Sequence, residues 1–67
     1  MWKVGQIVHL SEEGENALNL PEGTEGTVTA VNNLKDYVMA YKYPIRVRWN
    51  HPEVVGDMLM RDEEVVE

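Results

Sequence analysis

The chain has 67 residues, no cysteine and a formal net charge of −6. This length predicts one small domain, which has little interior for an elaborate active site and no disulfide or thiolate metal site to stabilise it. The acidic balance argues against duplex DNA or an anionic membrane as the main partner, because both repel a negatively charged protein. No apolar run suits a signal peptide or a membrane span, so we expect a cytoplasmic protein.

Short runs of β-forming residues separated by turn residues predict an all-β domain over residues 1–67. The first strand is expected at residues 6–10, where Val8 and Leu10 face inward and Ile7 and His9 the other side. A long polar loop is expected next, over residues 11–25, and its apolar middle could pack against the core through one helical turn.

The stretch "PEGTEGTV", residues 21–28, places Gly23 and Gly26 three positions apart and raises the question of a phosphate-binding loop. A nucleotide loop needs a Lys-Ser/Thr pair after its glycines, whereas Gly26 is followed by Thr27 and Val28. Glutamates flank both glycines and would repel phosphate. We therefore predict a tight turn, in which Gly23 supplies a positive φ and Gly26 lets the next strand bend.

The clearest strand is predicted at residues 44–49. Ile45, Val47 and Trp49 alternate there with polar residues in a strict period of two, so the apolar set faces inward. Arg46 and Arg48 then face outward. The other predicted elements are a second strand at 26–32, a hairpin arm or loop at 34–43, a fourth strand at 57–60, a 3₁₀ turn at 61–64 and a short last strand at 65–66.

These strands predict a core of ten apolar side chains. Two methionines near the fourth strand, Met58 and Met60, either fill the core or lie beside the arginines, depending on the register. The predicted core residues are Val4, Val8, Leu10, Val28, Ala30, Ile45, Val47, Trp49, Leu59 and Val65.

Four phrases along residues 4–67 carry a resemblance to a known group of proteins. "VGQIVHL" and "EGTEGTVTAV" resemble the first two strands of small SH3-like, KOW-like β-barrel proteins of bacteria and their phages. "YPIRVRWN" resembles their tyrosine- and tryptophan-bearing strand, and "RDEEVVE" their acidic turn and closing strand. The resemblance implies an SH3-like barrel of about five short strands, here with one long loop and an extended middle hairpin or loop.

Catalytic, cofactor-binding and metal-binding residues are not expected. His51 lies near Glu53 and Asp57, but their spacing matches no strong metal motif, and surface histidines are the simpler interpretation. Ser11 is the only serine, and no histidine is fixed beside it to activate it. We therefore expect no enzyme, no cofactor and no bound metal.

The middle of the chain is the most informative region for binding. Residues 35–52 carry four cations against one acid, and three tyrosines accompany them. Either this basic strand pairs with acidic neighbours within the fold, or it forms a local basic face. Tyrosine and arginine are enriched at protein interfaces, so we predict a non-catalytic protein-interaction module, in a small phage or bacterial accessory protein. The predicted partner-binding residues are Tyr37, Tyr41, Tyr43, Arg46 and Arg48.

Two alternatives use the same residues differently. Single-stranded nucleic acid could stack on the tyrosines over the arginines, although the acidity of the chain disfavours nucleic acid as a partner. An acidic DNA-mimic inhibitor would instead present rows of carboxylates. A protein partner is expected, no membrane, and self-association stays open. The carboxylates available for DNA mimicry are Glu12, Glu13, Glu15, Asp62, Glu63, Glu64 and Glu67.

Overall fold

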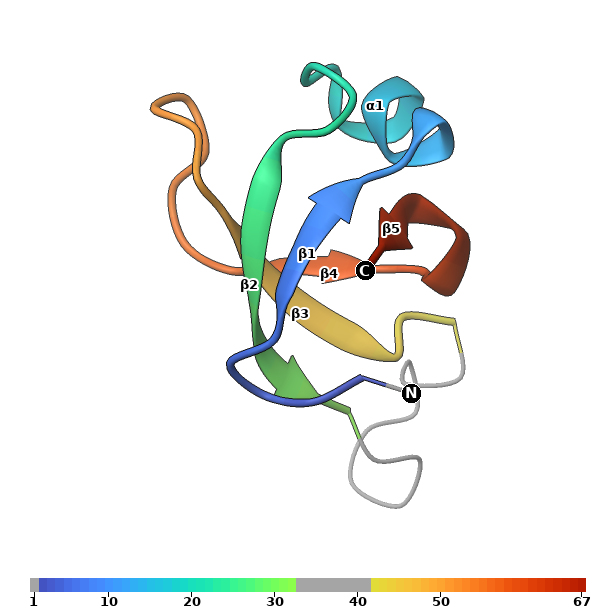
Figure 1. The fold of residues 1–67 in the computed structure, drawn as a ribbon, viewed down its shortest axis with the longest axis vertical. Helices are drawn as coiled ribbons and strands as arrows, with labels where there is room; N and C mark the ends of the chain where they lie inside the picture. Colours follow the sequence, from blue (N-terminus) through green and yellow to red (C-terminus); the bar gives the residue numbers. More distant parts are fainter. Residues whose placement is uncertain (1, 33–41) are drawn as a thin grey trace.

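One curled antiparallel sheet of five strands dominates the structure and forms a half-barrel (Figure 1). The computed structural model describes residues 2–32 and 42–67. The strand order is β4-β3-β2-β1-β5. The strand bounds lie within two residues of those predicted, and the mostly-β class is confirmed. The strands are β1 (Ile7–Leu10), β2 (Glu25–Val31), β3 (Ile45–Trp49), β4 (Met58–Met60) and β5 (Val65–Val66).

The inner side of the sheet forms the hydrophobic core. In β3, Ile45, Val47 and Trp49 are buried and alternate with exposed residues, as the period of two predicts. Seven of the ten predicted core residues are buried. The full set of buried apolar side chains is Val8, Leu10, Leu20, Val28, Ile45, Val47, Trp49, Met60 and Val65.

Three of the core predictions are wrong. Val4 is 67% exposed, because the chain turns at Gly5, which has a φ of 89°, before β1 begins. Ala30 and Leu59 are half-buried and lie outside the core cluster. Met60 takes the inward position in β4 that we assigned to Leu59, since it lies opposite Ile45 in the register of β3 and β4.

Residues 12–18 form a helix of seven residues, α1 (Glu12–Leu18), where the sequence suggested a loop with one helical turn. The side chain of Ser11 caps its start by accepting a hydrogen bond from the Gly14 amide at 3.1 Å. Three glutamates in the first turn complement the positive end of the helix dipole. Asn19 ends the helix in the left-handed conformation, with a φ of 57°. Within the described residues, no helix is both long and apolar enough to cross a membrane.

The predicted 3₁₀ turn is present as η2 (Asp62–Glu64), and α1 packs directly against it. Glu64 is 5% exposed, and its carboxylate accepts hydrogen bonds from the Arg61 amide at 2.8 Å and from Arg61 Nη2 at 3.1 Å. The hydrogen bond between the two side chains and the negative charge of Glu64 raise the pKa of Arg61 above its ordinary value. Ser11 joins the two elements, because its amide donates to the Glu64 carbonyl and its hydroxyl to the Glu63 carbonyl.

The loop with two glycines is a turn, as predicted. Gly23 has a φ of 85°, and its amide donates to the carbonyl of Leu10 at 2.9 Å. The irregularity in β2 lies between Val28 and Ala30, where the register against β3 shifts, and not at Gly26. Gly26 therefore has a different role, which concerns its packing against β3.

Candidate functional site

The outward side chains of β3 lie in the middle of the sheet and form part of a mixed apolar and cationic surface. Arg46 and Arg48 are exposed. In the strand register, Arg46 lies between Ala30 of β2 and Leu59 of β4. Arg48 lies opposite Thr27, which in turn lies opposite Ile7 of β1. We name this surface the outer-sheet face and define it by Ile7, Thr27, Ala30, Arg46, Arg48 and Leu59.

The outer-sheet face combines exposed apolar area with guanidinium groups. Ile7 is 51% exposed, and Ala30 and Leu59 are half-buried. Directly opposite side chains on adjacent strands lie about 5 Å apart at their Cβ atoms, so the Arg46 stem lies beside Ala30 and Leu59, whereas Thr27 separates Arg48 from Ile7. Arginine is enriched at protein–protein interfaces, and a partner that covers this face also removes the apolar area of Ile7 and Leu59 from water.

The two arginines differ in their charge environment. Arg48 Nε lies 3.3 Å from Asp57 Oδ1, but the Arg48 side chain is 68% exposed, so solvent screens this ion pair. Arg46 forms no ion pair with any residue that the structure describes. Arg46 is therefore the cation of this face that is available to a partner.

The predicted tyrosines are placed only in part. Tyr43 is half-buried just before β3, and Lys42 Nζ lies 5.6 Å from the centroid of its ring, a cation–π contact. Asn32 fixes this position, because its side chain donates to the Tyr43 carbonyl at 2.7 Å. Tyr37 and Tyr41 lie outside the described residues.

The register also places the methionines. Met60 is fully buried opposite Ile45, and Met58 lies opposite Val47 and packs against the core. The side chain beside Arg46 is Leu59, so β4 brings leucine and not methionine to the outer-sheet face.

A second surface feature is a hollow of about 230 Å³ between the end of α1 and the turn that joins β3 to β4. Leu18, Val54 and Met58 are partly buried apolar walls that pack against the core. We name it the α1-end hollow. Its lining residues are Leu18, Asn19, Leu20, Glu53, Val54 and Met58.

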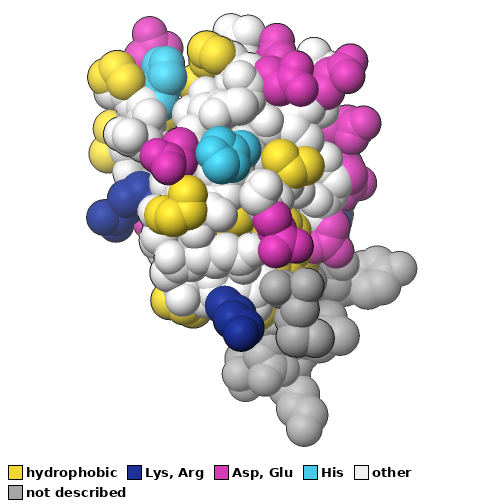
Figure 2. All heavy atoms as spheres, in the orientation of Figure 1, with side chains coloured by type: hydrophobic (Ala, Val, Ile, Leu, Met, Phe, Trp, Pro, Cys, Tyr) yellow, Lys and Arg dark blue, Asp and Glu magenta, His cyan; other side chains and the backbone are white. Residues whose placement is uncertain are grey.

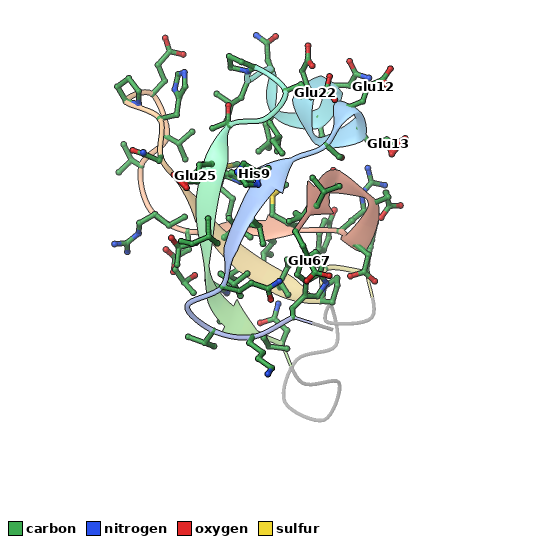
Figure 3. All side chains as sticks on the ribbon, viewed as in Figure 1. His9, Glu12, Glu13, Glu22, Glu25 and Glu67 are labelled. Atoms are coloured by element: carbon green, nitrogen blue, oxygen red, sulfur yellow. The ribbon has the colours of Figure 1, made fainter. Side chains whose placement is uncertain are left out.

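Negative charge gathers at the end of the molecule that holds α1. Residues 11–26 and 50–56 contain six glutamates and neither lysine nor arginine. In Figure 2, acidic side chains cover the region of α1 and η2, and Figure 3 shows Glu12, Glu13 and Glu22 at this end. Of the described cations, Arg61 precedes η2, which packs against α1, and is paired with Glu64; Lys3, Lys42, Arg46 and Arg48 belong to other segments.

The histidines do not combine with other ligands. His9 lies on the outer side of β1 beside Glu25, its partner in β2 (Figure 3). His51 Nδ1 accepts a hydrogen bond from the Glu53 amide at 3.2 Å within the β3–β4 turn. Over residues 2–32 and 42–67, no group of three His, Cys, Asp or Glu side chains is placed to hold a metal ion.

The set of carboxylates considered for DNA mimicry needs one correction. Glu64 is buried and bound to Arg61, so it is not part of any surface row. Glu12, Glu13, Asp62, Glu63 and Glu67 are exposed, and Glu15 is half-buried.

Sequence patterns identified Arg46 and Arg48 but missed Ile7, Ala30 and Leu59. These residues join the arginines only through the pairing of β1, β2 and β4 with β3, which no local pattern specifies. The α1-end hollow was missed because its walls come from three separate segments. Comparisons of the chain with models of protein families, with curated proteins and with solved structures found no match.

Proposed function

We propose that the chain is a non-catalytic protein-interaction module with an SH3-like barrel, in the cytoplasm of a bacterium or as an accessory protein of a phage. Two features support the barrel type. The sheet order returns β5 to the side of β1, and a 3₁₀ turn joins β4 to β5. Short edge strands of three and two residues limit unspecific sheet pairing, which suits a module that binds through a sheet face.

The outer-sheet face is the observation that carries the proposal. Arg46 is exposed and without an ion pair among the described residues, and it lies between Ala30 and Leu59. A protein partner matching this face offers a carboxylate to Arg46, one apolar side chain to Leu59 and, across the sheet, a second apolar side chain to Ile7. The arginine supplies orientation and specificity, and the burial of apolar area supplies most of the affinity.

Nucleic acid fits this face less well. Arg48 is already paired with Asp57, which leaves few unpaired cations on β3 for phosphates. The remaining surface carries a large excess of carboxylates, which repel a polyanion. Binding to phosphates also weakens steeply with salt, whereas an interface based on apolar burial does not.

A capture experiment tests this proposal. The tagged chain is immobilised, exposed to bacterial lysate with and without nuclease treatment, and washed at low and at high salt. We expect a stoichiometric protein that remains at high salt and that an Arg46→Glu variant fails to retain. Lys3→Glu is the control, because it makes the same change in net charge at an exposed cation outside this face.

Two results would overturn the proposal. Equal capture by the Arg46→Glu variant and the unmodified chain would remove the outer-sheet face as the binding surface. If the chain retained only nucleic acid from untreated lysate, and high salt released all of it, the chain would be a phosphate-binding protein and not a protein-interaction module.

A further inference from the structure

We propose that the α1-end hollow is a second, separate docking site, which accepts one apolar side chain from a positively charged peptide segment of a protein partner. It does not depend on the outer-sheet face, because none of its lining residues belongs to that face.

The size of the hollow selects a single side chain. Its volume is about 230 Å³. An apolar cavity of about 150 Å³ holds a benzene molecule, and sites for drug-sized ligands begin at about 300 Å³. The hollow therefore has room for one leucine-sized or larger apolar side chain and is too small for a nucleotide or a flavin.

The walls of the hollow favour an apolar occupant. Leu18, Val54 and Met58 remain partly accessible even though they pack against the core. Leu20, 5% exposed, forms the buried side. An entering apolar side chain removes apolar area of these walls from water, which favours binding.

The rim determines the charge of the occupant. Glu53 is the one charged residue of the lining, and the two segments that supply five of its six lining residues, 11–26 and 50–56, carry glutamates and neither lysine nor arginine. A segment with lysine or arginine beside its apolar anchor is attracted to this end, and an acidic segment is repelled. A second copy of this chain would bring the same glutamates to the contact, so like charges oppose self-association at this site.

Nuclear magnetic resonance of the ¹⁵N-labelled chain tests the proposal with three probe peptides. The first has one leucine between pairs of lysines, the second has alanine in place of that leucine, and the third has glutamates in place of the lysines. We expect saturable shifts of the Leu20, Glu53 and Val54 amides with the first peptide. Affinity for the alanine peptide should be about tenfold to fiftyfold lower, since leucine has three more side-chain carbons than alanine and each contributes about 0.8 kcal/mol at full burial. The glutamate peptide should not bind.

Variants separate the hollow from general attraction by charge. Val54→Asp should abolish binding of the leucine peptide, whereas Val55→Asp should not, because Val55 is 93% exposed and does not line the hollow. Glu53→Lys should weaken binding several-fold. Glu67→Lys is its control, since Glu67 lies away from α1 (Figure 3). The amide spectrum of each variant establishes that it is folded.

Three results would overturn the proposal. The first is equal affinity for the leucine and alanine peptides. The second is a set of shifts spread over the glutamates of α1 without those of Leu20 and Val54. The third is a dependence of the Val54 shift on protein concentration without peptide, which would identify a second copy as the occupant.

Discussion

Gly26 and Trp49 are direct partners across β2 and β3, and the indole of Trp49 occupies the space that a side chain at Gly26 would need. A Cβ at this position would lie 2.6 Å from Trp49 Cε3 and 2.8 Å from Val47 Cγ1. Trp49 is 2% exposed, and its indole N–H has no hydrogen-bond partner among the described residues. Packing alone therefore holds the ring, and the missing side chain of Gly26 makes that packing fit.

Replacement of Gly26 by alanine should therefore destabilise the fold, although alanine is ordinarily the better residue within a strand. Overpacking of this kind costs about 1–3 kcal/mol. The measurement is the free energy of unfolding in urea. Glu25→Ala, an exposed change one residue away in β2, is the control and should stay within about 0.5 kcal/mol. Equal midpoints for the two variants would contradict the packing of Trp49 on Gly26.

Gly14 gives a second test in which local propensity and packing oppose each other. Alanine in place of glycine within a helix ordinarily stabilises it by about 1 kcal/mol. At Gly14 a Cβ would collide with the Glu64 carbonyl oxygen and lie 2.6 Å from Leu10 Cδ1. We expect Gly14→Ala to lower the free energy of unfolding by about 1–3 kcal/mol. Asn16→Ala, at an exposed position of the same helix, should raise it slightly.

The carboxylate of Glu64 should matter far more than that of its neighbour. Glu64→Gln leaves one fewer acceptor for Arg61 at a buried position, and the expected loss is about 1–3 kcal/mol of unfolding free energy. Glu63→Gln is the matched control, because that side chain is exposed and only its main-chain carbonyl accepts from Ser11. Urea unfolding of both variants decides the matter, and equal losses would show that the Arg61–Glu64 contact is not formed in solution.

The orientation of the β3 side chains could be predicted from the sequence, because strict alternation of apolar and polar residues allows only one way to bury the apolar set. Ile45, Val47 and Trp49 alternate with arginines, so burying the apolar set exposes Arg46 and Arg48 without further information. The helix α1 was underestimated because seven residues are too few to display a helical period. Its start was nonetheless encoded, since Ser11 followed by glutamates is an N-cap signal.

The sequence could not predict which side chains of the short segments face the core and which face outward. A strand of three residues such as β4 has no repeat to show, and only its pairing with β3 assigns Met60 to the core and Leu59 to the arginine row. Val4, predicted in the core, is exposed because the chain turns at Gly5 before β1 begins, a turn that no local pattern of apolar residues shows. The candidate face was therefore half predictable: its arginines follow from β3 alone, and its apolar members follow from the register.

Substitutions at Leu59 and Met60 test both the register of β4 and the outer-sheet face. Met60→Ala removes a fully buried side chain and should cost about 2–5 kcal/mol of unfolding free energy. Leu59→Ala, at a half-buried position outside the core cluster, should cost about 1 kcal/mol or less. The same Leu59→Ala variant should lose most of the protein capture that depends on Arg46, because it removes the apolar neighbour of that arginine. If Leu59→Ala cost more stability than Met60→Ala, Leu59 and not Met60 would face the core. Full capture by a folded Leu59→Ala variant would confine the binding surface to the arginines.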